Sequence, residues 1–347
     1  MKLATLKSER RDGTLIVVDQ NLEWGVAAPE IAGTMQEALD RWDDCRARLE
    51  AIYYALNDGR VDNPFLLDIT KLAAPLPRAY QFLDGSAYLS HVELARRARG
   101  ASMPPEFETE PLMYQGCSDR LLGPRDPILA ANEEWGIDFE GEVAVVTGDV
   151  SMGVAVAEAA AHIKLFMLVN DISLRQLIRA EVAKGFGFLH SKPPSSFSPV
   201  AVTTDEFGSA WDGAKVHLPL ITHFNHELFG RPDAGTDMHF GFPALISYAA
   251  KTRPLSAGTI IGSGTVSNRD RARGSSCLVE KQMLEILERG NPTAAYMHFG
   301  DRVRIEMFDT RGRSIFGAID QVVRPYPRGA RRETTKIQPV EEWPITE

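Results

Sequence analysis

Cysteine is scarce in this chain, and the few that occur form no motif. Cys45, Cys117 and Cys277 are odd in number, lie far apart and include no C-x-x-C pair. This spacing excludes a disulfide framework and argues against a zinc–thiolate cluster. The sequence also has no apolar run near the roughly 20 residues of a membrane-spanning helix, and its first residues lack the apolar core of a signal peptide. We therefore expect a protein of the reducing cytoplasm, with no membrane partner.

Basic residues are in short supply as well. Lys and Arg number 38 against 47 Asp and Glu, which gives a formal net charge of −9. A general nucleic-acid binder needs a surplus of positive charge to displace counterions, so that class of protein is not expected. A small acidic substrate stays compatible with this charge, because one local basic pocket can bind it. At 44% hydrophobic and 24% charged residues, the composition is that of an ordinary globular protein.

The chain of 347 residues is long enough for one large and one small domain. A small N-terminal domain is predicted from a hairpin that turns at residues 12–13 and a helix over 34–57. Pro75 and Pro77 mark its end. The predicted parts are a small N-terminal domain (1–75), a catalytic domain (76–328) and a polar C-terminal tail (329–347).

The region after this boundary predicts an α+β fold rich in strands. Apolar runs of strand length occur in 112–114, 143–146, 164–170 and 258–267, and a hairpin is expected over 301–323 with its turn near 309–312. Helical spacing is present in 155–163, 172–184, 241–250 and 277–289.

The strongest local feature is the segment 138–142, Asp-Phe-Glu-Gly-Glu, which runs into the apolar strand 143–146. Side chains alternate along a strand, so Asp138, Glu140 and Glu142 would share one face at a spacing of roughly 7 Å. Carboxylates this close repel one another unless they are paired or bind a metal. The alternative is a solvated edge strand with glutamates on the surface.

Two further features carry charge beside apolar sequence. The predicted strand 165–169 leads directly to Asp171, and Arg175 follows one helical turn later. An Asp at a strand-to-helix junction is most often an N-cap, so this position alone decides little. Lys192 lies in a loop of apolar and proline residues, where it could polarise a substrate carbonyl or bind a carboxylate, although a surface lysine is the commoner case.

The loop 262–268, Gly-Ser-Gly-Thr-Val-Ser-Asn, offers backbone N–H groups and small hydroxyls for a carboxylate. Its spacing is not that of a dinucleotide fingerprint. Glu280 follows early in a predicted helix, where compensation of the helix dipole is its simplest role. His223 and His226 do not predict a zinc site, because their spacing needs a helix and this segment predicts strand and turn.

Taken in order, these features resemble the fumarylacetoacetate hydrolase superfamily, over residues from about 80 to 325. The ordered set is Gly-Pro-Arg-Asp-Pro-Ile at 123–128, then 138–142, then Asn-Asp-Ile-Ser-Leu-Arg at 170–175, then the Lys192 loop and then 262–268. The resemblance implies an α+β fold with a rolled mixed β-sheet behind a small N-terminal domain. It also implies a homodimer and one Mg²⁺ or Ca²⁺ in each site, with Mn²⁺ as a further option.

The resemblance also implies a set of site residues. They are the metal ligands Glu140, Glu142 and Asp171, the catalytic residues Lys192, Arg175, Glu280, Asp119 and His91, and the substrate contacts Tyr114, Thr265 and Ser196. His91 enters through Tyr-Leu-Ser-His-Val-Glu at 88–93, which resembles a lid motif in some branches of the family.

Several positions depart from the family pattern. The family's fourth carboxylate ligand falls on Leu112, and its catalytic histidine falls on Asp119. Two polar substrate contacts fall on Ile178 and Val182. We therefore do not expect fumarylacetoacetate itself to be the substrate.

The activity that the resemblance implies is hydrolysis of a C–C bond in a β-diketo or 2-oxo acid of the fumarylacetoacetate or acylpyruvate type. A divalent cation would act as a Lewis acid that stabilises the developing enolate, and Lys192 and Arg175 would add positive charge. Water would be activated by Glu280, Asp119 or His91. A hydratase, decarboxylase or tautomerase of a 2-oxo acid could use the same site, and a non-catalytic, metal-stabilised binding protein is the alternative of another class.

Overall fold

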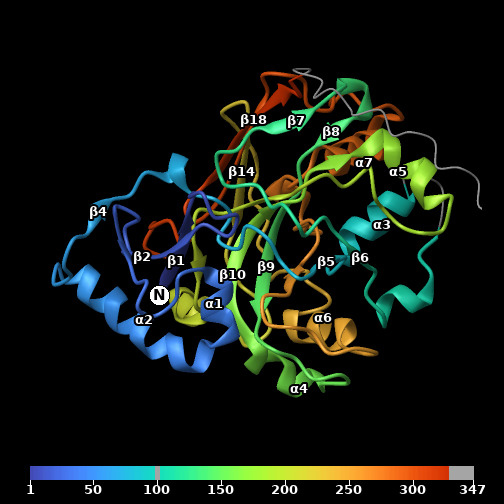
Figure 1. Cartoon of the computed structure of the whole chain (residues 1–347). Helices are drawn as coiled ribbons and strands as arrows, with labels where there is room; N and C mark the ends of the chain where they lie inside the picture. The colour runs from blue at the N-terminus through green and yellow to red at the C-terminus, as the bar shows by residue number, and fades with distance from the viewer. Residues whose placement is uncertain (98–101, 328–347) are drawn as a thin grey trace, which may run out of the picture.

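The computed structural model describes residues 1–97 and 102–327, so the predicted C-terminal tail lies outside the described residues. The fold is α+β and rich in strands, as the sequence predicts. Figure 1 shows the strands β9 (Gly141–Thr147) and β10 (Ile163–Asn170) at the centre of the molecule. The described residues form three sheets, of eleven, five and two strands.

The two larger sheets are mixed, and the two-stranded sheet is antiparallel. The largest has the order β4 (Phe65–Leu66), β3 (Trp24–Ala27), β2 (Thr14–Val18), β1 (Lys2–Leu6), β13 (Ala201–Val202), β10, β9, β16 (Ile260–Gly262), β5 (Phe82–Gly85) and β6 (Met113–Gln115), with β12 (Ser196–Phe197) paired to β10. The second has the order β15 (Glu227–Gly230), β14 (Leu220–Phe224), β17 (Arg302–Met307), β18 (Ile319–Pro325) and β7 (Ile128–Ala130), and the smallest pairs β11 (Ser173–Leu174) with β8 (Ile137–Asp138). The pairs β16–β5 and β18–β7 are parallel, whereas neighbours such as β9–β10 and β9–β16 are antiparallel.

The helices cover the sheets from several sides. They are α1 (Met35–Asp40), α2 (Trp42–Asn57), α3 (Leu89–Arg97), α4 (Val156–Ala159), α5 (Arg175–Val182), α6 (Phe242–Ala249) and α7 (Leu278–Arg289). Short 3-10 helices occupy Ile69–Lys71, Pro105–Glu108, Glu133–Trp135, Ala160–His162, Thr204–Ala210 and Arg271–Arg273. In Figure 1, α1 and α2 lie beside the N-terminal strands, and α3, α5 and α7 gather at the opposite end of the molecule. Within the described residues, no helix combines the length and apolarity needed to span a bilayer.

The first hairpin forms where the sequence predicts it. β1 and β2 pair antiparallel, and Gly13 in the turn has a φ of +62°, where a Cβ would lie 2.4 Å from the carbonyl oxygen of Leu6. The predicted helix over 34–57 is broken in two, because Arg41 leaves the helical region at φ −127° and ψ 38°. Thr34 caps α1, since its hydroxyl accepts from the backbone N–H of Glu37 at 3.2 Å.

The largest sheet carries a hydrophobic core on each face. Alternation along β10 places Met167 and Val169 in one core, together with Trp42 of α2. Phe166 and Leu168 lie in the other core, which also contains residues of α6, β14 and β17. The N-terminal helices therefore cover one face of the sheet, and the second sheet and α6 cover the other.

The acidic segment 138–142 is not the continuous strand that its alternation predicts. β8 ends at Asp138 and β9 begins at Gly141, with Glu140 in an isolated bridge to Cys277. The chain breaks here because the segment changes its pairing partner from β11 to the residues before α7. The apolar run that was predicted as a strand over 258–267 is likewise strand only in β16.

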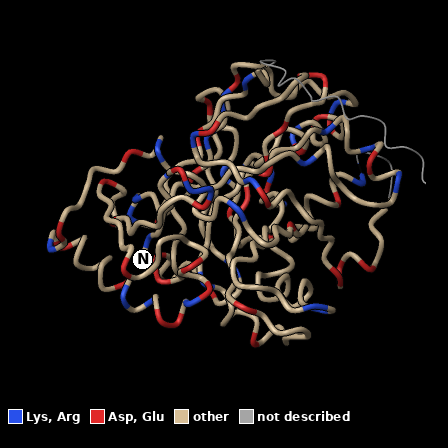
Figure 2. Tube along the Cα trace, in the orientation of Figure 1, with Lys and Arg blue, Asp and Glu red and all other residues tan. Residues whose placement is uncertain are grey.

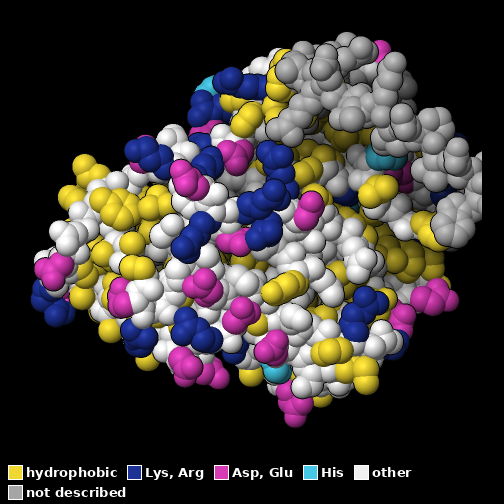
Figure 3. Space-filling model, viewed as in Figure 1, with side chains coloured by type: hydrophobic (Ala, Val, Ile, Leu, Met, Phe, Trp, Pro, Cys, Tyr) yellow, Lys and Arg dark blue, Asp and Glu magenta, His cyan; other side chains and the backbone are white. Residues whose placement is uncertain are grey.

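Charged residues occur along the whole described trace (Figure 2). On the face shown in Figure 3, acidic and basic side chains are interspersed with apolar ones. The charge that matters for chemistry is buried, near the ends of β5, β9 and β10.

Candidate active site

Three buried carboxylates meet at the end of one face of the large sheet. Asp84 lies on β5, Glu142 lies on β9 and Asp171 follows β10, and one oxygen of each lies within 4.8 Å of the others. β16 runs between β5 and β9, and its Gly262 is in register with Asp84. A Cβ on Gly262 would lie 2.3 Å from Asp84 Oδ1 and 3.1 Å from Glu142 Oε2. Because this residue has no side chain, acids from two strands that are not neighbours can meet across it.

The cluster is electrostatically unbalanced on its own. Glu142 is fully buried, and neither of its carboxylate oxygens receives a hydrogen bond from any described residue. Burial raises the pKa of Glu142 well above its usual range, and the negative charges of Asp84 and Asp171 raise it further. Burial, followed by the charge of Asp171, also raises the pKa of Asp84 to about 8. The cluster therefore needs protons or a cation to be stable.

Neighbouring donors fix the directions of the other two acids. The Gly264 N–H donates to Asp84 Oδ1 at 3.0 Å. The Ser195 hydroxyl donates to Asp171 Oδ1 at 2.6 Å, and the Tyr114 hydroxyl donates to Asp171 Oδ2 at 2.5 Å. Such contacts hold carboxylates in place before a ligand arrives.

The donor set fits a hard divalent cation. The group of Asp84, Glu142 and Asp171 offers carboxylate oxygens alone, which are the ligands that Mg²⁺, Ca²⁺ and Mn²⁺ prefer. The two orphaned oxygens of Glu142 would gain the partner that they lack. These residues can therefore hold such an ion.

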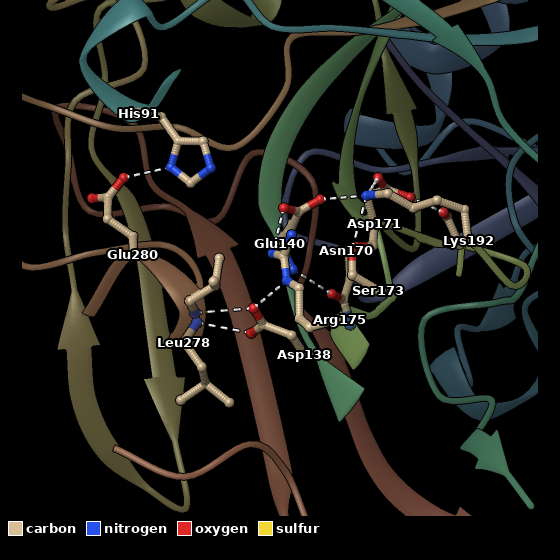
Figure 4. Close-up of polar contacts among 12 residues, drawn as sticks. His91, Asp138, Glu140, Asn170, Asp171, Ser173, Arg175, Lys192, Leu278 and Glu280 are labelled. Carbon is tan, nitrogen blue, oxygen red and sulfur yellow. Dashed lines mark hydrogen bonds and ion pairs between the residues drawn. The ribbon is translucent and has the colours of Figure 1, made fainter. Parts of the chain in front are cut away.

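A buried lysine lies beside the cluster (Figure 4). Lys192 Nζ donates to Glu140 Oε2 at 2.6 Å, to Ser173 Oγ at 2.8 Å and to Asp171 Oδ2. Burial would lower the pKa of Lys192, but the charges of Asp171 and Glu140 outweigh it and hold the pKa above its ordinary value. The ammonium group is therefore charged, inside the protein.

Arg175 extends this network away from the cluster. Its Nη2 donates to Glu140 Oε1 at 2.5 Å, and its Nε donates to Asp138 Oδ2 at 2.8 Å. Burial would raise the pKa of Glu140, but Arg175 and Lys192 together hold it well below its usual range. The carboxylate of Glu140 is thus ionised, and each of its oxygens accepts a hydrogen bond from a positively charged side chain.

A histidine and a glutamate pair on the other side of Glu140. His91 of α3 places Nδ1 2.7 Å from Glu280 Oε2 of α7, and Figure 4 shows the imidazole between Glu280 and Glu140. Burial would raise the pKa of Glu280, but the hydrogen bond and charge of His91 hold it below its ordinary value. An ionised carboxylate can only accept, so Nδ1 carries a hydrogen, and Nε2 is the ring nitrogen that can act as a base.

The carboxylate cluster differs from the predicted ligand set in one member. Glu142 and Asp171 come together as expected, but the third acid is Asp84, and Glu140 is engaged by Arg175 and Lys192 instead. Sequence reasoning missed Asp84 because Phe-Leu-Asp-Gly at 82–85 was not recognised as a strand. Its one signal is the short apolar pair Phe-Leu before the acid, a weaker form of the apolar strand that precedes Asp171.

The two acids that were expected to be catalytic, Glu280 and Asp119, lie in different surroundings. Asp119 is exposed, and its Oδ1 accepts from Cys117 Sγ at 3.2 Å. The structure thus brings His91, and not Asp119, to Glu280.

Two of the three residues that were expected to contact substrate lie at the acidic cluster, and the third does not contact it. Tyr114 touches the cluster through Asp171, and Thr265 is buried in the loop that carries the donor to Asp84. The Ser196 hydroxyl instead donates to the carbonyl of Gly123 at 3.0 Å, and its neighbour in sequence takes the contact with Asp171.

The fold and the acidic cluster define a class of protein: a mixed-sheet domain that carries a metal-competent carboxylate site. Residues 81–324 match the family described as fumarylacetoacetate (FAA) hydrolase C-terminal, and residues 1–78 match the fumarylacetoacetase N-terminal domain 2. The chain therefore belongs to the fumarylacetoacetate hydrolase superfamily, an enzyme family whose members act on oxo acids.

Named relatives include a hydrolase and oxaloacetate tautomerases. The chain is 28% identical over 208 residues to oxaloacetate tautomerase YisK of Bacillus subtilis, across 58% of this chain and 64% of that protein. It is 30% identical over 160 residues to 2,4-didehydro-3-deoxy-L-rhamnonate hydrolase of Sphingomonas sp., across 45% of this chain and 53% of that protein. Both matches thus span less than two thirds of the relative.

Solved structures share the fold over almost the whole chain. Maleylpyruvate hydrolase of Sphingobium sp., solved with manganese(II) and pyruvate, has a TM-score of 0.62 at 17% identity and covers 94% of this chain and 99% of its own. Fumarylacetoacetate hydrolase of Exiguobacterium antarcticum has a TM-score of 0.64 at 18% identity, with 94% of this chain and 100% of its own covered.

Proposed function

We propose that this protein is a divalent-metal-dependent hydrolase that cleaves a C–C bond in a small β-diketo or 2-oxo acid. The observation that carries the proposal is the buried cluster of three carboxylates, with an orphaned Glu142, beside a charged lysine. That lysine is bound to Glu140, and a histidine–glutamate pair lies on the other side of Glu140. A purely structural ion site has no use for a buried ammonium group against it and a base beyond that group.

Asp84, Glu142 and Asp171 would hold the cation, and Mg²⁺, Ca²⁺ or Mn²⁺ each suit an all-oxygen set. When bound, the cation supplies Lewis-acid stabilisation of negative charge on the oxygens of a 2-oxo acid. Glu140 stays a predicted ligand, although its oxygens would first have to leave Arg175 and Lys192.

The two buried cations would bind and polarise the substrate. Lys192 and Arg175 are fixed by carboxylates, so their positive charge is already in place before the reaction starts. A substrate carbonyl or carboxylate could exchange for one of the present acceptors of Lys192 Nζ. Preorganised charge of this kind stabilises an oxyanion more strongly than mobile water does.

His91 is the base in this proposal, and Glu280 orients it. Nε2 of His91 takes a proton from water as the water oxygen bonds to the substrate carbonyl carbon. The neighbouring C–C bond then breaks, and its electron pair passes to the 2-oxo acid fragment as an enolate. The proton returns to the carbon of that enolate, so the products are two acids and the histidine is neutral again.

A tautomerase of a 2-oxo acid is the second candidate. It is favoured by the similarity to oxaloacetate tautomerase YisK. The same His91 would move a proton between carbon and oxygen of the enol, and no bond between carbons would break.

A substrate screen separates the two candidates. Purified protein with Mn²⁺ is incubated with acylpyruvates and, separately, with the enol form of oxaloacetate, and the products are followed by NMR. Two acids from an acylpyruvate support the hydrolase, whereas faster conversion of enol to keto oxaloacetate without cleavage supports the tautomerase. Metal-loaded protein that turns over neither substrate would count against both.

A further inference from the structure

Asp138 lies between the helix that carries Glu280 and the arginine that contacts Glu140, and it hydrogen-bonds to neither the acidic cluster nor His91. Its carboxylate is fully buried and accepts three hydrogen bonds. Oδ1 accepts from the Leu278 N–H at 2.8 Å, and Oδ2 accepts from the Val279 N–H at 3.0 Å and from Arg175 Nε at 2.8 Å. Figure 4 shows this carboxylate between the start of α7 and the arginine.

On one side, Asp138 supplies a cap that α7 does not have locally. Cys277 at the N-cap position makes no side-chain hydrogen bond to the helix. The first N–H groups of a helix have no partners within it, and a negative charge there also compensates the helix dipole. Asp138 satisfies the first two of these groups, and the next residue of the helix is Glu280. The cap thus fixes the helical turn that presents Glu280 to His91.

On the other side, Asp138 fixes the guanidinium of Arg175. The Nε contact leaves Nη2 aimed at Glu140 Oε1, at 2.5 Å. Glu140 in turn accepts from Lys192 through its other oxygen. The Asp138 carboxylate therefore contacts two parts of the site. One is helix α7, which carries Glu280, and the other is Arg175, which is linked through Glu140 and Lys192 to the acidic cluster.

We propose that Asp138 is a positioning residue that sets the His91–Glu280 pair and the Arg175–Glu140 pair in register with each other. This inference rests on the proposed function of the same site. It assigns Asp138 no contact with substrate or cation. Its role is to keep His91 at a fixed distance from the side chains of Arg175 and Lys192 during the reaction.

Asp138→Asn is the direct test, because asparagine keeps the size of the side chain. Its amide nitrogen replaces one acceptor by a donor, so either an α7 amide or Arg175 must lose its partner. Loss of a supporting contact of this kind should lower kcat by about 10–100-fold. KM should change less than kcat, and Mn²⁺ affinity should be unchanged, because the hydrogen bonds of Asp138 go to α7 and Arg175 and not to the three clustered acids.

Glu285→Gln is the matched control. Glu285 lies on the same helix, is buried and accepts from the backbone N–H groups of Thr293 and Ala294 at 2.5 Å and 2.8 Å. Its replacement removes the same kind of contact at the far end of α7. It should lower thermal stability as Asp138→Asn does, with kcat unchanged.

A double variant tests whether Asp138 acts through the His91–Glu280 pair. Glu280→Gln should lower kcat by itself. If Asp138 works by placing Glu280, adding Asp138→Asn should lower kcat by no more than about threefold beyond the worse single variant. Two independent, multiplied losses would overturn the proposal.

A readout without turnover keeps the test separate from the proposed function. In protein labelled with ¹⁵N-histidine, the His91 signals are assigned by their loss in His91→Gln. We expect the Nδ1–H tautomer in the wild type and in Glu285→Gln, and an averaged tautomer signal in Asp138→Asn. If the wild type turns over no oxo acid, the proposed function fails, but this spectrum still decides the role of Asp138.

Asp138→Ser is the second variant, should the asparagine protein not fold. A serine hydroxyl still accepts from one amide of α7, as a good cap does, but it cannot also hold Arg175. Wild-type kcat together with a wild-type His91 spectrum, in either folded variant, would overturn the proposal.

Discussion

Replacing Glu142 with glutamine keeps the size of the side chain and makes it neutral at every pH. In the present structure, both oxygens of Glu142 lack a donor, and the carboxylates of Asp84 and Asp171 lie beside them. Because the pKa of Glu142 is raised well above its ordinary value, the metal-free wild type must take up a proton there on folding, whereas glutamine is already neutral. The glutamine amide can also donate to one of these acids, and a hydrogen bond to a charged group contributes about 1.5–3 kcal/mol. We therefore expect metal-free Glu142→Gln to be more stable than the metal-free wild type by about 2 kcal/mol.

The size of the effect can be read in a melting experiment. An unfolding entropy of about 2.1 cal/mol/K per residue means that 347 residues shift Tm by roughly 1.4 °C per kcal/mol. Metal-free Glu142→Gln should thus melt about 3 °C above the wild type. With Mn²⁺ at a thousandfold excess over its Kd, the wild type gains about 4 kcal/mol, or roughly 6 °C. The variant has lost a ligand and should gain little, so the order of the two proteins reverses.

Differential scanning calorimetry with EDTA and with Mn²⁺ measures both differences. Glu306→Gln is the control, because Glu306 is a buried acid that does have partners, Arg304 Nη2 at 2.5 Å and Ser314 Oγ at 2.7 Å. It should be destabilised in both buffers. If Glu142→Gln is destabilised without metal by as much as this control, then Glu142 has a structural partner and the reasoning is refuted.

Three further predictions concern pH and individual side chains. The folded-state pKa of Asp84, about 8, exceeds its ordinary value of 3.8, so the folded metal-free protein binds more protons than the unfolded chain between these values. Its stability should fall as pH rises from 4 to 8 in urea titrations with EDTA, while Mn²⁺ affinity by calorimetry rises; a flat affinity would contradict the proton-loaded cluster. His91→Gln should lower kcat by about 10²–10⁴-fold, whereas Asp119→Asn should leave it unchanged, and the reverse order would assign the base to Asp119. Lys192→Met should lower kcat by about 10²–10³-fold, and retention of wild-type kcat in the folded variant would exclude Lys192 from the reaction.

Local sequence patterns identified much of the site. The pattern around Glu142 indicates a site, because carboxylates beside an apolar strand are costly unless they have partners. Asp171 by itself could be an N-cap, and the family resemblance assigns it to the site. Lys192 and Arg175 stood out by position, and the structure joins both to Glu140. The length and spacing of the apolar runs also predict the strand-rich α+β fold, because a short apolar run indicates a buried strand from local sequence alone.

The remaining parts depend on contacts between distant segments. Asp84 joins the cluster because β16 separates β5 from β9 and carries Gly262 at the crossing, which no local pattern reveals. His91 meets Glu280 because α3 packs against α7. The break of the acidic segment at Asp138 arises where the chain changes its pairing partner, so simple alternation could not foresee the cap on α7.

A crystal structure with Mn²⁺ tests the central claim most directly. Anomalous diffraction should show one ion with oxygens of Asp84, Glu142 and Asp171 within about 2.0–2.6 Å of it. The ligand atoms of His91, Glu140 and Cys277 also lie within 4.8 Å of one another. An ion bound there, with Asp84, Glu142 and Asp171 free of metal, would contradict the account.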